Sequence, residues 1–131
     1  MNALDSSVIK GLLALLAMLG VFAGPTTRGP VVVRMTAAHV FEPPVVTIRS
    51  GEEVVWKNED QAVHAVVGDP HLALHRSDIE PPSPPEPFHS DDLGPGQSFR
   101  RTFTLEGVYR YVCPHHEEQG MNGTVIVQGG P

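Results

Sequence analysis

One short stretch of this sequence gathers side chains that bind soft metal ions. In Tyr109–Gly123, YRYVCPHHEEQGMNG, the only cysteine of the chain, Cys113, is followed by His116 and Met121 in the spacing C-x2-H-x4-M. A thiolate, an imidazole and a thioether are soft or borderline ligands, and together they suit copper better than a hard cation. Cysteine and histidine also serve zinc, but zinc has little use for a thioether, so Met121 favours copper.

A mononuclear copper site of this kind needs a second imidazole, and His64, far upstream, could supply it. The competing interpretation is structural, because a free cysteine is usually a small buried hydrophobe and methionine usually fills core space. That interpretation gives no reason for the spacing after Cys113, nor for Gly120 and Gly123, which free the backbone around Met121.

Three segments resemble the plastocyanin-like cupredoxins. YRYVCPHHEEQGMNGTVIVQ resembles their copper-binding loop and last strand, FEPPVVTIRSGEEVVWKNEDQAVHAVV their first half, and PFHSDDLGPGQSFRRTFTLEGVYRYVC their connecting region. The resemblance covers about Val31 to Gln128 and implies an all-β fold, a cupredoxin-like Greek-key β-sandwich. It also implies one copper ion per chain, cycling between Cu(I) and Cu(II), with the ligands His64, Cys113, His116 and Met121.

The resemblance further implies a small blue-copper protein that carries single electrons between redox partners. In the family the ring edge of the residue matching His116 lies in an apolar surface patch, so a cytochrome or oxidase-like partner is expected to dock there, on a monomer. His115 stands where the family commonly has proline, and we expect it to be exposed beside this surface. Ala65 stands where the family often has a hydrogen-bonding side chain, so the family's redox tuning, which depends on such bonds, is not carried over.

A periplasmic copper carrier or sequestration protein is the alternative function. Its motivation is a set of further histidines, namely His71, His75, His89 and His115. His71 and His75 could share a metal on one helical turn, but HLALH is short, and we prefer two exposed side chains. His39 and His89 have no evident partner in the sequence. An enzyme is not expected, because the chain has no His-x-His pair of the multicopper type and no G-x-S-x-G nucleophile motif.

Length and charge limit the remaining possibilities. The chain has 131 residues, which suits one domain, and its formal net charge of -6 comes without a basic stripe. Nucleic acid is therefore not an expected partner. A lone cysteine cannot form an internal disulfide, and metal ligation would explain an unpaired thiol in an exported protein.

The N-terminus predicts export. Lys10 precedes an apolar run that ends at Ala23 and is shorter than the roughly 20 residues that span a bilayer. We expect a signal peptide over 1–23, a linker over 24–30 and a periplasmic or secreted domain over 31–128 with a short tail, 129–131. An uncleaved N-terminal anchor is the alternative, since Asp5 is atypical; after cleavage no stable membrane insertion is expected.

Short β-branched runs between turns predict a sandwich or barrel. We expect strands over Val31–Met35, Val45–Ile48, Val54–Asn58, His64–Val67, Phe99–Leu105, Val108–Cys113 and Thr124–Gln128. Alternation places Tyr109, Tyr111 and Cys113 on one face, and Trp56, Phe99 and Phe103 are expected in the core, with Asn58 as a structural residue of the following turn. The Pro-rich segment 69–88 is expected to be an inserted surface loop with polyproline II character between Pro81 and Pro87.

Overall fold

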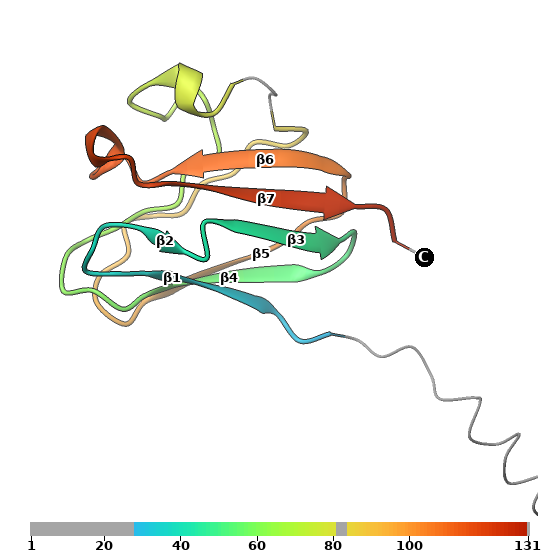
Figure 1. The fold of residues 1–131 in the computed structure, drawn as a ribbon, viewed down its shortest axis with the longest axis horizontal. Helices are drawn as coiled ribbons and strands as arrows, with labels where there is room; N and C mark the ends of the chain where they lie inside the picture. The colour runs from blue at the N-terminus through green and yellow to red at the C-terminus, as the bar shows by residue number, and fades with distance from the viewer. Residues whose placement is uncertain (1–27, 81–83, 131) are drawn as a thin grey trace, which may run out of the picture.

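The computed structural model describes residues 28–80 and 84–130, and its architecture is a sandwich of two sheets (Figure 1). The strand order is β2-β1-β4-β5 in one sheet and β3-β7-β6 in the other. The all-β sandwich predicted from the sequence is confirmed. Its elements are β1 (Val31–Met35), β2 (Phe41–Glu42), β3 (Val45–Arg49), β4 (Glu53–Asn58), the 3-10 helix η1 (Arg76–Asp78), β5 (Ser98–Thr102), β6 (Gly107–Val112), the 3-10 helix η2 (Glu117–Gln119) and β7 (Asn122–Gln128).

The strand pairing brings the loop after β6 to one end of the sandwich. β6 and β7 pair antiparallel, with Val112 opposite Asn122, while β7 also pairs in parallel with β3. Cys113 therefore directly follows the edge strand β6, and Met121 directly precedes the central strand β7. The start of β1 and the end of β7 lie toward the other end of the sandwich (Figure 1).

Aromatic side chains from both sheets fill the core. The buried set comprises Phe41, Trp56, Phe88, Phe103, Tyr109 and Tyr111. The ring centroid of Trp56 lies 5.4 Å from that of Tyr111 in a T-shaped contact that joins the two sheets. Burying each such side chain stabilises the fold by roughly 1.5 to 3 kcal/mol. The core assignments of Trp56, Phe103 and Tyr109 are confirmed, whereas Phe99 is only partly buried against the core.

The predicted strand over His64–Val67 is wrong. In its place, single bridges join His64 to Leu93 and Val67 to His89 and Val112. Side chains explain the difference, because Ala65 donates its N–H to Cys113 Sγ and Val66 donates its N–H to Ser90 Oγ. These two N–H groups therefore donate to side chains and not to the backbone of a neighbouring strand. The strand predicted over Val31–Met35 is confirmed as β1, the other predicted strands differ by one to three residues at one or both ends, and β2 was not predicted.

The segment after Gly68 packs back onto the sandwich. Ile79, just after η1, is fully buried against Val67 and Val112, with Ala73 beside them. The Pro-rich run reaches residues 81–83, which lie outside the described residues, as do the predicted signal peptide and most of the predicted linker. Within the described part of the chain, no helix has the length and apolar character needed to cross a membrane.

Candidate metal centre

The loop between β6 and β7 folds around its own hydrogen bonds. Cys113 donates its N–H to Met121 O at 3.0 Å, and Met121 donates its N–H to His116 O at 3.2 Å. His116 in turn donates its N–H to Cys113 O at 3.0 Å. The backbones of the three predicted ligand residues of this loop are therefore tied to one another, and Cys113 and Met121 are fully buried.

His64 reaches the same end of the sandwich from a separate segment. Its backbone exchanges hydrogen bonds with Leu93, at 3.1 Å and 2.7 Å. Asn58, at the end of β4, donates from Nδ2 to Ala62 O and to Leu93 O. These bonds fix the turn that carries the fully buried His64, and they bear out the structural role expected for Asn58.

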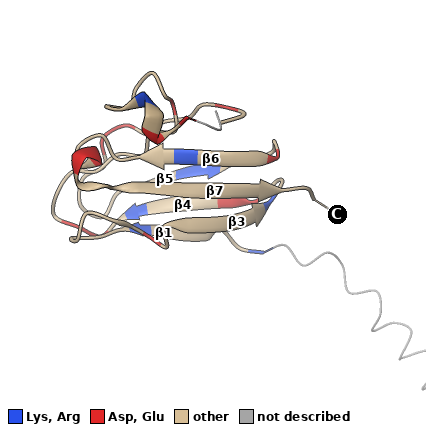
Figure 2. Ribbon diagram, turned by 45° about the horizontal axis from the view of Figure 1, so that its top comes forward, with Lys and Arg blue, Asp and Glu red and all other residues tan. Residues whose placement is uncertain are grey.

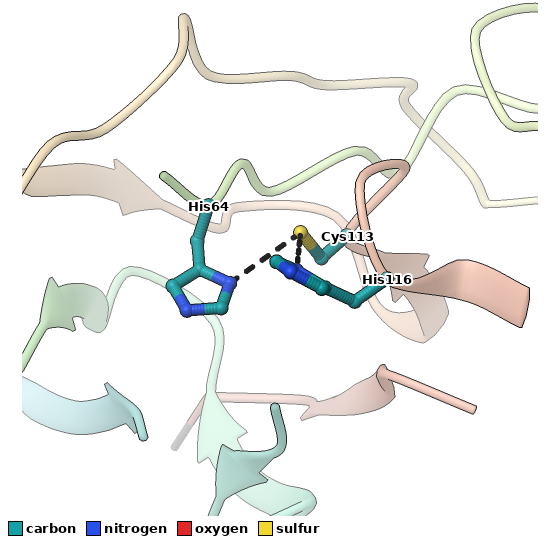
Figure 3. A group of neighbouring side chains, drawn as sticks. All are labelled: His64, Cys113 and His116. Atoms are coloured by element: carbon teal, nitrogen blue, oxygen red, sulfur yellow. Dashed lines mark hydrogen bonds between the residues drawn. The ribbon is translucent and has the colours of Figure 1, made fainter. Parts of the chain in front are cut away.

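The donor atoms of three predicted ligands converge. Cys113 Sγ lies 3.7 Å from His64 Nδ1 and 3.6 Å from His116 Nδ1 (Figure 3). The three atoms lie within 4.8 Å of one another, an arrangement that can hold a metal ion. One thiolate and two imidazoles beside a methionine are the donor set of a trigonal copper site with an axial thioether, so the residues present fit copper.

Asp60 orients His64, although it is not among the site residues predicted from the sequence. Its Oδ2 lies 2.9 Å from Nε2 of His64 in a buried contact. An ionised carboxylate only accepts, so Nε2 carries the proton and Nδ1 keeps its lone pair toward the cysteine. The hydrogen bond with His64 lowers the pKa of Asp60 below its usual range. The sequence signal that could have revealed Asp60 is a carboxylate four residues before the histidine. A metal-binding imidazole often donates its other ring N–H to such a carboxylate.

The protonation of the site suits metal binding. Burial lowers the pKa of His116, and the neighbouring rings of His39 and His64 lower it further, so this ring is neutral and offers a lone pair. Burial raises the pKa of the Cys113 thiol, although backbone N–H groups beginning with that of Ala65 oppose the effect. Metal binding must therefore displace the thiol proton.

The backbone N–H of Ala65 makes a hydrogen bond to the cysteine segment, which the alanine side chain cannot make. The N–H of Ala65 donates to Cys113 Sγ at 3.4 Å. Ser90 accepts from the N–H of Val66 at 2.9 Å and donates to Asp91 O at 2.7 Å. The two segments are thus connected beside the cysteine without a polar side chain directly after His64.

The remaining histidines do not form a second metal group among the described residues. His75 Nε2 contacts Glu118 Oε1 at 3.0 Å, while His71 Nδ1 lies 3.5 Å from Arg76 Nη1. Both histidines are exposed, as preferred above. His115 is exposed and contacts Asp92 at 2.7 Å.

His39 had no evident partner in the sequence, but in the structure it contacts His116 and Gln119. Its ring stacks on that of His116 with centroids 3.9 Å apart. No local pattern in the sequence signals this contact, since 77 positions separate the two residues (116 − 39).

A two-sheet β-sandwich with one buried cysteine and two converging histidines at its end defines a mononuclear copper protein of the type 1 class. Residues 31–128 match the family described as copper binding proteins of the plastocyanin/azurin family. The chain belongs to this family, as the three quoted segments indicated.

Named relatives agree with this assignment. The chain is 38% identical over 94 residues to plastocyanin from Scenedesmus fuscus, covering 71% of this chain and 91% of that protein. It is 38% identical over 90 residues to halocyanin from Natronomonas pharaonis, covering 67% of this chain and 48% of the relative, about half its length.

Solved structures share the fold. The Cu(I) form of an amicyanin variant superposes with a TM-score of 0.60 at 25% identity, covering 79% of this chain and 86% of the other. A copper-containing nitrite reductase from Thermus scotoductus gives 0.63 at 31% identity, but the match covers 84% of this chain and only 24% of the reductase. Family, fold and donor set identify the chain as a plastocyanin-like carrier of single electrons with one type 1 copper.

Proposed function

We propose that His64, Cys113, His116 and Met121 are the four copper ligands through which this carrier exchanges electrons with redox proteins. The observation that carries the assignment is the convergence of the thiol and the two imidazoles within 4.8 Å. Bound copper supplies a one-electron change between Cu(I) and Cu(II). Met121 is included because it is buried and its backbone is bonded to both loop ligands.

The protein's contribution is to hold donors in an arrangement that changes little with oxidation state. Cu(II) favours tetragonal sites, whereas a trigonal set with a weak axial thioether is a compromise that also suits Cu(I). The backbone bonds of Cys113, the Leu93 bridge of His64 and the carboxylate of Asp60 fix the donors from separate segments. Little rearrangement is then needed when the electron enters or leaves.

Partner docking is assigned to the surface around His116. This ring is partly exposed, unlike the buried His64, so it offers the shorter path to a partner. Val40 and Val63 are 43% and 44% exposed and adjoin His39 and His64 in the sequence, which supports an apolar contribution from these two segments. A cytochrome or oxidase-like protein is the partner class.

Nucleic acid remains an unsuitable partner. Among the described residues, Figure 2 shows Lys and Arg distributed over several strands of both sheets and not gathered in one basic stripe. A nucleic-acid surface needs such residues clustered on one face.

Location outside the cytoplasm forms part of the proposal. The apolar run that ends at Ala23 supports a signal peptide over 1–23 and a periplasmic or secreted domain over 31–128. N-terminal sequencing of the mature protein tests this, since an uncleaved chain would begin with the leader.

The ligand assignment is tested by loading the purified domain with Cu(II). We expect an intense visible thiolate-to-copper band and a reversible reduction potential in the parent. C113S should lose the band, whereas H71A, at an exposed histidine, should keep it. A colourless and redox-silent parent protein, or a C113S variant that stays blue, would contradict the assignment.

The copper-handling alternative makes a different prediction. It requires more than one tightly bound copper per chain and rapid transfer to a chelator. The contacts of His75 with Glu118 and of His115 with Asp92 give these histidines other partners. Copper titration followed by mass spectrometry under native conditions distinguishes one ion from several.

A further inference from the structure

His39 covers one face of His116. The two rings are stacked, with centroids 3.9 Å apart and planes 28° from parallel. His39 lies between β1 and β2, a segment that contributes none of the four proposed ligands. A third part of the chain therefore contacts the outer imidazole of the site.

Two polar contacts hold the His39 ring in this place. Nδ1 lies 2.6 Å from Oε1 of Gln119 in η2, the short helix directly after His116. Nε2 lies 3.9 Å from Oδ2 of Asp60, the same oxygen that contacts His64 Nε2 at 2.9 Å. His39 thus connects the surroundings of both histidine ligands.

The backbone at His39 adopts a conformation that is unfavourable for most residues. Its φ is +56°, in the left-handed region, where residues other than glycine are uncommon and where asparagine, aspartate and histidine are enriched. The turn closes through its backbone, because His39 donates its N–H to Thr36 O at 2.9 Å and Thr36 donates its N–H to Val40 O at 3.1 Å. The His39 ring takes no part in the hydrogen bonds that close the turn, so its contacts with His116 and Gln119 need another explanation.

We propose that His39 is a positioning residue that holds the ring of His116 by stacking, and so restricts the movement of an outer copper ligand. The proposal rests on the ligand assignment above. The His39 ring, with its centroid 3.9 Å from that of His116, blocks rotation of the partly exposed His116 ring out of the site. The contact with Gln119 holds the His39 ring in this position.

Two variants separate the ring from the turn. H39N keeps a side chain that tolerates positive φ but removes the stacked ring. H39F keeps an aromatic face but removes the contacts with Gln119 and Asp60. H71A changes an exposed histidine elsewhere and is the matched control.

The first readout is the rate at which Cu(II) passes from the protein to an excess of chelator. We expect H39N to release copper about tenfold faster, the lower end of the loss seen when supporting residues of metal ligands are removed. H39F should recover most of the parent rate, and H71A should match the parent. Equal rates in H39N and the parent would overturn the proposal, as would an H39F rate as fast as that of H39N in a variant whose melting temperature matches that of the parent.

The second readout uses the copper-free protein, so it does not depend on the ligand assignment. We expect NMR of the His116 ring to show one set of resonances in the parent and exchange-broadened resonances in H39N, while thermal unfolding of both confirms a folded domain. Unbroadened His116 resonances in H39N would overturn the positioning role. A parent without the blue band would overturn the ligand assignment alone.

Discussion

The carboxylate of Asp60 accepts a hydrogen bond from Nε2 of His64 at 2.9 Å, on the opposite side of the ring from the nitrogen that faces Cys113. This contact fixes both the tautomer and the orientation of the imidazole. It also makes the ring a stronger donor toward a metal, because a negative charge lies behind it.

Replacing Asp60 should therefore weaken copper binding and raise the reduction potential. We expect D60N to lower the copper affinity by about tenfold to a hundredfold, and to favour Cu(I), because a neutral amide supports the cupric state less well. Chelator competition and voltammetry measure the two effects. D91N, at an exposed carboxylate, is the control, and a D60N protein with unchanged affinity and potential would argue against this role.

Glu117 should anchor the 69–80 segment to the copper loop. Its buried carboxylate accepts N–H bonds from Leu74 at 2.7 Å and from His75 at 2.8 Å. E117A leaves these donors without their acceptor, at a cost of about 1 to 3 kcal/mol, measured by urea unfolding. Limited proteolysis should show faster cleavage within 69–80.

The adjacent carboxylate provides the comparison for that experiment. Glu118 pairs with His75 at the surface, with both side chains more than half exposed, and exposed pairs contribute about 0 to 1 kcal/mol. E118A should therefore unfold almost like the parent. If E117A and E118A lowered the free energy of unfolding equally, the buried position of Glu117 would not be the cause of its effect.

Gly123 should tolerate no side chain. A Cβ at this position in β7 would meet the ring of Tyr111, which is buried against Phe41 and Trp56. G123A should destabilise the domain by about 1 to 3 kcal/mol through overpacking, read from denaturant midpoints. G94A is the control, because a Cβ there meets only Gln97 at ordinary contact distance; a G123A protein as stable as G94A would contradict the packing argument.

Tyr109 should make the domain sensitive to alkali. Burial raises the pKa of its hydroxyl, which donates to Leu105 O at 2.7 Å. Because the folded pKa lies above the unfolded value of about 10, the stabilisation is complete below that pH and is lost as pH rises through the folded pKa. Y109F should flatten this alkaline fall in stability, and an identical pH profile for the two proteins would exclude Tyr109 as its source.

Removal of copper should leave the sandwich folded. The core is aromatic and aliphatic and lies between the sheets, so its burial does not require the metal. Far-UV circular dichroism of the copper-free protein should match that of the loaded protein, while the melting temperature should rise with added copper, because the ion binds the folded state. A copper-free chain with the spectrum of a random coil would contradict this.

The sequence predicts the ligand loop well because soft donors are rare and their spacing is local. Cys113, His116 and Met121 all lie between one strand and the next, so a short pattern contains them. His64 needed the family resemblance, because nothing local joins it to Cys113. Asp60 lies only four residues before His64 and was missed, whereas the contact of His39 with His116 depends on which segments meet in three dimensions. The strand expected at His64–Val67 fails because Ser90 and Cys113 accept its N–H groups.

Strand β1 begins and strand β7 ends at the end of the sandwich opposite the loop between β6 and β7 (Figure 1). A membrane anchor or a second domain attached at either place would therefore leave the surface around His116 open. The proposed docking surface around His116 would then stay accessible in a free domain and in an attached one.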